Sequence, residues 1–206
     1  MSRLLAAFVS LTAVSFIACS DAPKEVPFPK EPEKPPEAVT GRKAFYAMYP
    51  MARIWASDIQ GLRLSSIRLD KFKVEEGKSG AWEATFVSPS RSKQRSYTYS
   101  VIEGGGNLHK GVFEGFEESY APTSGSAGPW PIQAFKIDSD QAWKTAAAKS
   151  TAYMAKFPNK PMFFLLEMTS RAPDLSWRVV WADSVSNSDY SVYVDAVTGD
   201  FLEKMR

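Results

Sequence analysis

The residue types that carry most enzyme and metal chemistry are scarce in this chain of 206 residues, which has one histidine and one cysteine. His109 has no Cys/His cluster around it, so neither a zinc site nor a nucleophile–base pair is expected. The glycine run at 104–106 lacks the Lys-Ser/Thr that follows in a phosphate-binding loop. Asp195 and Asp200 flank a turn without the ligand ladder of a calcium loop. We therefore expect no catalytic residue, no metal and no cofactor.

Charge is nearly balanced along the chain, with 25 Lys+Arg against 23 Asp+Glu. Such a balance creates no global field that would attract nucleic acid, and none is expected as a partner. The densest basic run, residues 91–95, is interpreted as a solvated hairpin tip. Contact with anionic lipid head groups, glycans or an acidic partner is the alternative. Glu114, Glu117 and Glu118 are interpreted as a solvated acidic edge.

The single cysteine, Cys19, follows a segment that is typical of exported proteins. Arg3 precedes an uncharged apolar run over residues 4–18, which is too short for the roughly 20 residues of a membrane span. Residues 1–18 are therefore expected to be a signal peptide. The end of the run, Phe16-Ile17-Ala18-Cys19, resembles the lipobox of bacterial lipoproteins, although that family usually has Leu at the place of Phe16.

The lipobox resemblance implies that Cys19 is acylated, for example with palmitate, and becomes the mature N-terminus. Several buried acyl chains anchor a protein stably. The inner-membrane retention signal of that family is an Asp directly after the cysteine, whereas this chain has Ser20. We therefore expect the cell envelope as the location, with the outer membrane favoured and the protein facing the periplasm.

Residues 19–38 are predicted to hold the lipidated cysteine and a Pro/Lys/Glu-rich tether. Six of the 14 prolines lie here. Proline fixes φ and removes a donor, so neither a helix nor a central strand is expected. A polyproline-like segment rises about 3.1 Å per residue and would hold a domain on the order of 50–60 Å from the lipid.

Residues 138–206 predict a helix followed by strands. Asp138, with Gln141 three residues later, has the pattern of a capping box, and apolar residues then recur at helical spacing up to Phe157. Strand-like runs follow, at 161–168, 177–181 and 190–195. The chain then turns, and Phe201-Leu202 resume an apolar pattern.

Residues 39–114 predict a similar series of elements, with Thr40 as the helix cap. The face formed by Trp82, Ala84 and Phe86 repeats 95 residues later, and residues 97–101 match 190–194 at an offset of 93. Pro50 predicts a kinked helix or a second short helix, and Leu62, Leu64 and Ile67 indicate a strand with a bulge. Residues 115–137 form the connector, ordered through Trp130, Ile132 and Phe135. Two chance helix-and-meander segments in one α+β domain are the alternative to an internal duplication.

The segment Tyr190-Ser191-Val192-Tyr193-Val194-Asp195-Ala196-Val197-Thr198-Gly199-Asp200, after a Trp-containing strand and a helix, resembles the PepSY domain. The resemblance covers 138–206, and in the first copy residues 103–106 replace the Asp-Ala-x-Thr-Gly turn. It implies two extracytoplasmic, non-catalytic PepSY-like units in tandem, similar in shape to the tandem β-lactamase inhibitor proteins. From the residues themselves, Gly199 supplies a positive φ, and Asp195 and Thr198 bind the turn backbone.

The sequence therefore predicts an α+β fold of two helix-plus-antiparallel-sheet units and a non-enzymatic, membrane-anchored lipoprotein. It is expected to bind or modulate another envelope protein, such as a peptidase or other hydrolase. A structural lipoprotein without a discrete ligand is the alternative, and an unrecognised hydrolase is less favoured. The candidate binding surface is aromatic, for which core packing is the competing interpretation. It consists of Tyr97, Tyr99, Tyr190, Tyr193 and Trp130.

Overall fold

Two helices and ten strands make up the part of the chain that the computed structural model describes, residues 35–205 without 71, 107 and 124. These residues belong to one compact unit, which begins at Pro35. In chain order the elements are β1 (Val39–Thr40), α1 (Gly41–Trp55), β2 (Gln60–Ile67), β3 (Lys78–Ser79), β4 (Ala81–Ser88), β5 (Lys93–Ser100), β6 (Gly111–Ser119), α2 (Ser139–Lys156), β7 (Met162–Glu167), β8 (Ser176–Ser184), β9 (Asn187–Asp195) and β10 (Phe201–Met205), with short 3₁₀ turns at Pro89–Arg91 and Ile132–Ala134.

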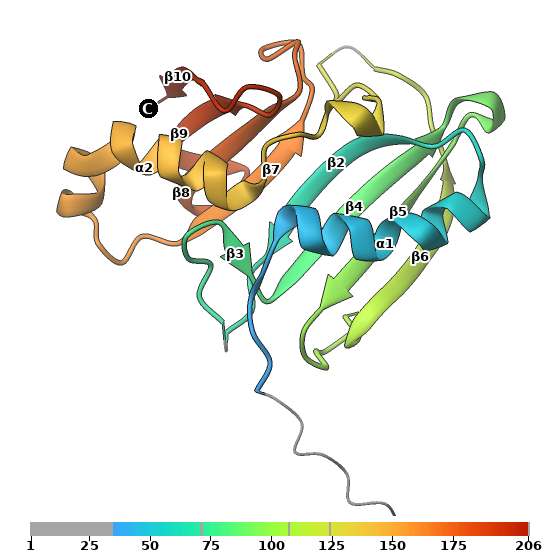
Figure 1. Cartoon of the computed structure of the whole chain (residues 1–206), viewed down its shortest axis with the longest axis horizontal. Helices are drawn as coiled ribbons and strands as arrows, with labels where there is room; N and C mark the ends of the chain where they lie inside the picture. The colour runs from blue at the N-terminus through green and yellow to red at the C-terminus, as the bar shows by residue number, and fades with distance from the viewer. Residues whose placement is uncertain (1–34, 71, 107, 124, 206) are drawn as a thin grey trace, which may run out of the picture. The chain divides into compact units, whose positions relative to one another are not determined.

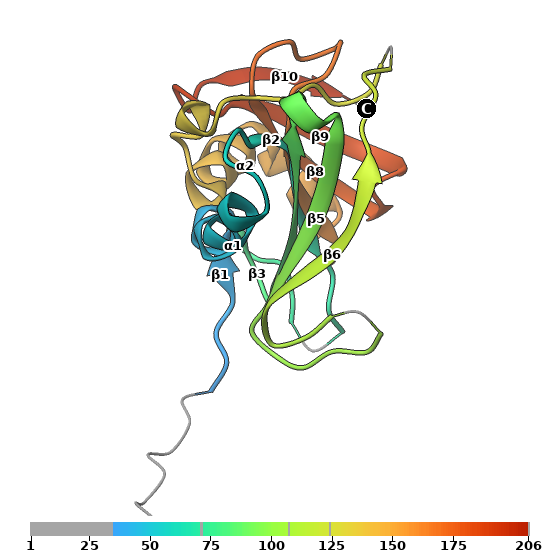
Figure 2. The same cartoon turned by 90° about the vertical axis from the view of Figure 1, so that its right-hand side faces the viewer.

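Eight of the strands form one antiparallel sheet in the order β10-β9-β8-β7-β2-β4-β5-β6. Both helices lie on the same face of this sheet (Figures 1 and 2), where α1 contacts β2, β4, β5 and β6, and α2 contacts β8 and β9. The predicted α+β fold is therefore confirmed. Each helix is followed by four strands of this sheet, while β3 pairs with β1 apart from it, and the two sets of four strands join where β2 pairs with β7, with Leu64 opposite Leu166.

The helix ends follow the predicted caps. Thr40 accepts a hydrogen bond from the Lys43 N–H, and Asp138 and Gln141 form the capping box at the start of α2. Helix α1 continues through Pro50 as one element to Trp55, so no second helix begins there. Strand β2 does contain a register shift, but it lies between Gly61 and Arg63, whereas the segment between Leu64 and Ile67, where the break was predicted, is regularly paired with β4.

The core lies between the helices and the sheet and is rich in aromatic rings. Trp82, Ala84 and Phe86 are all fully buried there, as the strand alternation predicts, and so are Trp177 and Val179. Complete burial of a side chain such as Phe86 or Val179 contributes about 1.5–3 kcal/mol. The connector takes part as well, since Trp130, Ile132 and Phe135 are buried in the same cluster. Strand β6 runs on to Ser119, past residue 114, where we expected the first unit to end.

The two helix N-termini meet at Ser139. Its hydroxyl oxygen accepts a hydrogen bond from the Gly41 N–H at 2.8 Å and donates one to the Gly77 carbonyl at 2.5 Å. Asp138 Oδ1 accepts from the N–H of Arg42 in α1 at 2.9 Å and from that of Ser139 in α2 at 2.6 Å. Only glycine fits at position 41, because a Cβ there would lie 2.8 Å from the ring of Trp177.

Replacement of Ser139 by alanine is expected to destabilise the fold by about 2–4 kcal/mol, because it leaves a buried N–H and a buried carbonyl without partners. Urea denaturation followed by tryptophan fluorescence measures the loss. Thr151→Ala, on an exposed position of the same helix, is the matched control and is expected to change stability by less than about 0.5 kcal/mol. Equal effects of the two substitutions would contradict this role of the Ser139 hydroxyl.

Candidate functional site

The sheet face opposite the helices, here called the open face, is covered by no helix of the described chain (Figure 2). Strand alternation places Arg63, Glu167 and Arg178 on it, because Leu64, Leu166 and Trp177 next to them belong to the helix-side core. A second, smaller apolar cluster also lies on this face, centred on Leu165, Val180 and Ala182.

An ion pair crosses the centre of the open face, where β2 meets β7. Arg63 Nε and Nη2 donate to the same oxygen of Glu167, Oε2, at 2.9 and 2.8 Å. The arginine side chain is 49% exposed and that of Glu167 is 9% exposed. The second arginine, Arg178, donates to the hydroxyls of Ser188 and Ser191 and lies over the ring of Tyr193. Both arginine side chains, Arg63 and Arg178, therefore have hydrogen-bond partners within the sheet.

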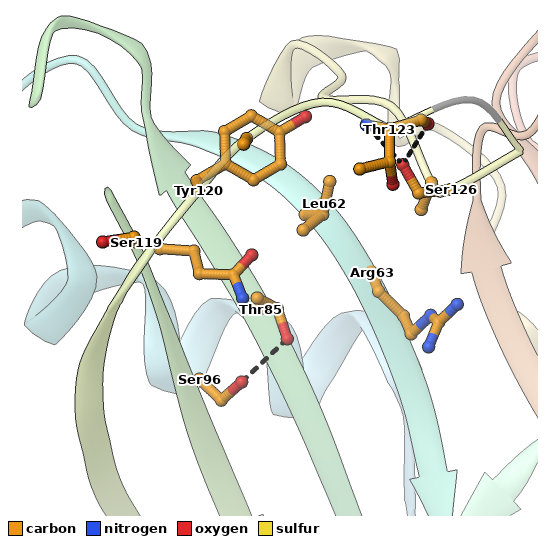
Figure 3. Close-up of a pocket in the computed structure, with 11 residues that line it drawn as sticks. Leu62, Arg63, Thr85, Ser96, Ser119, Tyr120, Thr123 and Ser126 are labelled. Atoms are coloured by element: carbon orange, nitrogen blue, oxygen red, sulfur yellow. Dashed lines mark hydrogen bonds between the residues drawn. The ribbon is translucent and has the colours of Figure 1, made fainter. Parts of the chain in front are cut away.

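A cavity of about 340 Å³ lies at one end of the open face. Its floor comes from β2, β4 and β5, and the segment after β6 forms its rim (Figure 3). Leu62 enters the floor at the bulge between Gly61 and Arg63. Most of the other side chains are hydroxyls or amides, so the cavity is polar. Its lining residues are Leu62, Arg63, Thr85, Gln94, Ser96, Ser119, Tyr120, Ala121, Thr123, Ser126 and Ala127.

The aromatic residues predicted as a binding surface lie mostly in the interior. Tyr97 and Trp130 are 0% exposed, Tyr190 is 2% and Tyr193 is 6% exposed. Tyr99 is half-buried against the core. The expected aromatic surface is therefore corrected to a set of packing residues, because the β-strand alternation turns Tyr97, Tyr99 and Tyr190 toward the helices. Tyr193 is on the open face beneath Arg178, and burial raises the pKa of its hydroxyl.

The basic run at 91–95 lies at the β4–β5 hairpin tip, as predicted, and Arg91 and Ser92 are exposed there. Its two arginines also have carboxylate partners within the fold. Arg91, in the 3₁₀ turn before β5, pairs with Glu117 of β6 at 2.6 Å, and Arg95 of β5 pairs with Glu114 of β6 at 3.1 Å. Both guanidinium groups also lie over the ring of Trp55, whose Nε1 donates to Glu117 at 2.8 Å. The bond from Trp55 is the main cause that lowers the pKa of Glu117. The glutamates thus serve as cross-strand partners.

Strand β6 is an edge of the sheet and carries exposed apolar side chains. It has nine residues, and no other strand of the described chain pairs with its outer side. Phe116 is 89% exposed and Phe113 is 38% exposed. The opposite edge, β10, has five residues and ends near the C-terminus. An unpaired strand edge offers free N–H and C=O groups to another chain.

The remaining candidates for chemistry have structural partners. His109 Nδ1 lies 2.6 Å from Glu103 Oε1 on the exposed turn after β5. Asp195 Oδ1 accepts from the N–H groups of Val197 and Thr198, and Gly199 has φ of 84°, which confirms the predicted turn. Among the described residues no group of His, Cys, Asp and Glu is arranged to hold a metal, and no helix is long and apolar enough to cross a membrane. Cys19, the predicted lipidation site, lies outside the described residues.

Comparison with known proteins places the chain near one solved structure. No model of a known protein family matches it, and no curated protein does. The chain is similar to the crystal structure of a candidate lipoprotein, CD1622 of Clostridium difficile 630, at 13% identity over 79% of this chain and 91% of that chain, with a TM-score of 0.48. A likeness of this degree carries no argument about function. Membership of the PepSY family stays a prediction.

Asp58 fixes the hairpin that carries the basic run. Its carboxylate accepts from the Ser88 hydroxyl at 2.6 Å and from the Ser90 N–H at 2.9 Å, and these bonds lower its pKa from 3.8 to about 2. A lowered pKa stabilises the folded state above the ordinary value near 4, and the benefit is lost as the pH falls toward 2. Asp58→Asn is therefore expected to lower the Tm at pH 6 and to differ less from the parent protein as the pH approaches 2. A Tm difference that grows on acidification would contradict this.

Proposed function

We propose that this chain is an exported, lipid-anchored envelope protein without catalytic function, which recognises a partner protein through the β6 edge of its sheet. The N-terminal segment that ends in Cys19 supports export and acylation, and Ser20 after it favours the outer membrane, with the folded unit on the periplasmic side. The proline-rich segment that follows gives the folded unit reach from the membrane.

We also propose that the folded unit is an internal duplication of a PepSY-like unit. The order of one helix and then four strands of the eight-stranded sheet occurs twice, with the short β3 as an addition in the first half. Equivalent tryptophans support the idea: Trp82 Nε1 donates to the Val39 carbonyl at 3.0 Å and Trp177 Nε1 to the Ile137 carbonyl at 2.8 Å. In both cases the acceptor is the residue directly before the helix cap. The Asp-Ala-x-Thr-Gly turn after β9 supports the family assignment for the second unit.

The observation that carries partner recognition is the nine-residue free edge of β6 with Phe116 almost fully exposed. Exposed strand edges in soluble proteins are usually shortened, charged or covered. In β6 Glu114 and Glu117 are paired with Arg95 and Arg91, and Glu118 accepts a hydrogen bond from the Gln94 amide. The phenylalanines therefore remain as apolar contacts beside free backbone groups, which is the arrangement that strand addition uses. The occupant would be an extended segment of an envelope protein.

Cys19→Ser is expected to move the full chain from the membrane fraction to the soluble envelope fraction and to abolish labelling by radioactive palmitate, because serine has no thiol to acylate. Fractionation of cells that express each form measures this. Ser20→Ala is the control and is expected to stay membrane-bound. Unchanged membrane retention and labelling of Cys19→Ser would contradict lipidation.

Photo-crosslinking tests recognition at the edge. With the crosslinking residue at position 113 in intact cells, one stoichiometric product is expected, and adding Phe116→Glu is expected to reduce it at least fivefold because a charge replaces an apolar contact. Ile54→Glu, at a position 86% exposed on α1, is the matched control and should leave the product unchanged. A smear of unrelated neighbours, insensitive to Phe116→Glu, would instead favour a structural protein without a discrete ligand.

A further inference from the structure

The cavity on the open face is separate from the β6 edge and has the size of a small-molecule site. At about 340 Å³ it lies at the lower end of the range for ligand pockets, which is roughly 300–1,000 Å³. Strands supply its floor: Thr85 and Gln94 are paired with neighbouring strands on both sides, Ser96 is paired with Thr85, and Leu62 is the extra residue of the bulge in β2. Tyr120 stands over this floor from the segment after β6 (Figure 3).

The charge of the cavity is balanced. Arg63 is the one charged residue in its lining, and two of the three guanidinium nitrogens bind Glu167 directly behind it. The pair has no net charge, so an anion gains little from the arginine and a cation finds no available carboxylate. Arg63 Nη1 takes no part in this ion pair, so its two N–H groups can donate to a ligand. A neutral ligand is the one that this balance suits.

The lining presents both donors and acceptors at close spacing. Gln94 Nε2 donates to Glu118 at 3.1 Å, which leaves its carbonyl oxygen as an acceptor. The hydroxyls of Thr85 and Ser96 bond to each other at 2.9 Å, so one of their two protons stays available to donate. The Tyr120 hydroxyl is enclosed and has no hydrogen-bond partner among the described residues. An ordered water or a ligand that reaches it can satisfy this hydroxyl.

We infer that this cavity binds a neutral sugar unit. A hexose ring carries adjacent hydroxyls that both donate and accept, which matches Arg63, Gln94, Tyr120 and the Thr85–Ser96 pair. It also carries C–H faces, which match Leu62 and the ring of Tyr120. An apolar ligand would bury these polar groups without partners, and a compact anion would have one shared guanidinium to bind.

The test uses the full-length protein in micelles of a detergent that contains no sugar. Saturation-transfer NMR and calorimetry are run with methyl α-glucoside, N-acetylglucosamine, glucuronate and glutamate as probes. At least one neutral sugar is expected to bind with a Kd in the millimolar range. Tyr120→Phe and Gln94→Ala are each expected to weaken it about five- to tenfold, since each removes one hydrogen-bonding group.

Matched controls place the effect in the cavity. Tyr46→Phe and Gln133→Ala make the same chemical changes at exposed positions in α1 and in the turn before α2, and are expected to leave the affinity unchanged. The inference is overturned if no neutral sugar binds, if only glucuronate or glutamate binds, or if the cavity variants and the controls behave alike. Because the crosslinking experiment reads β6 and this one reads the cavity, either proposal can fail without the other.

Discussion

The hydroxyl of Ser139 is the contact on which the arrangement of the fold depends. It receives the first N–H of α1 from Gly41 and binds the Gly77 carbonyl, so one atom ties the start of α1, the start of α2 and the loop before β3. The positive ends of both helix dipoles point to this place, where Asp138 supplies a negative charge and accepts an N–H from each helix. Helices fixed in this way lie on the same face of the sheet, and the opposite face stays open.

The division between the two faces follows from that constraint. Beneath the helix starts, the rings of Trp82 and Trp177 meet edge to face at 6.3 Å, and Gly41 leaves the room for them. Each indole binds the carbonyl that precedes a helix cap, which satisfies the one polar group of a large apolar side chain. The excess of aromatic residues is thus used on the helix side. On the open face, arginine, glutamate, serine and threonine lie beside the smaller apolar cluster of Leu165, Val180 and Ala182, and the polar residues gather at the cavity.

Local patterns predicted the fold well and the site poorly. The caps at Thr40 and Asp138 and the alternation of Trp82, Ala84 and Phe86 depend on residues close in sequence, so the sequence was enough to find them. The partners Arg63 and Glu167 are 104 residues apart, and nothing in either segment points to the other. Tyrosines on strands gave a misleading signal because composition does not tell which face a strand turns inward. Arg63, at the bulge beside Leu62, was the available clue in the sequence. It indicates a cavity only when the segment after β6 is seen to form the rim above it.

The edge and the cavity share one piece of chain. Strand β6 ends at Ser119, and the next residue, Tyr120, begins the rim while its N–H binds the Ser92 carbonyl at 2.9 Å. Ser119 itself accepts from Lys93 at 3.3 Å, and the ion pairs of Arg91 and Arg95 hold the strand from the other side. A segment added to β6 and a ligand under Tyr120 would therefore lie at neighbouring places on one continuous stretch of chain, which the bond from Tyr120 to Ser92 and the ion pairs of Arg91 and Arg95 already hold in place.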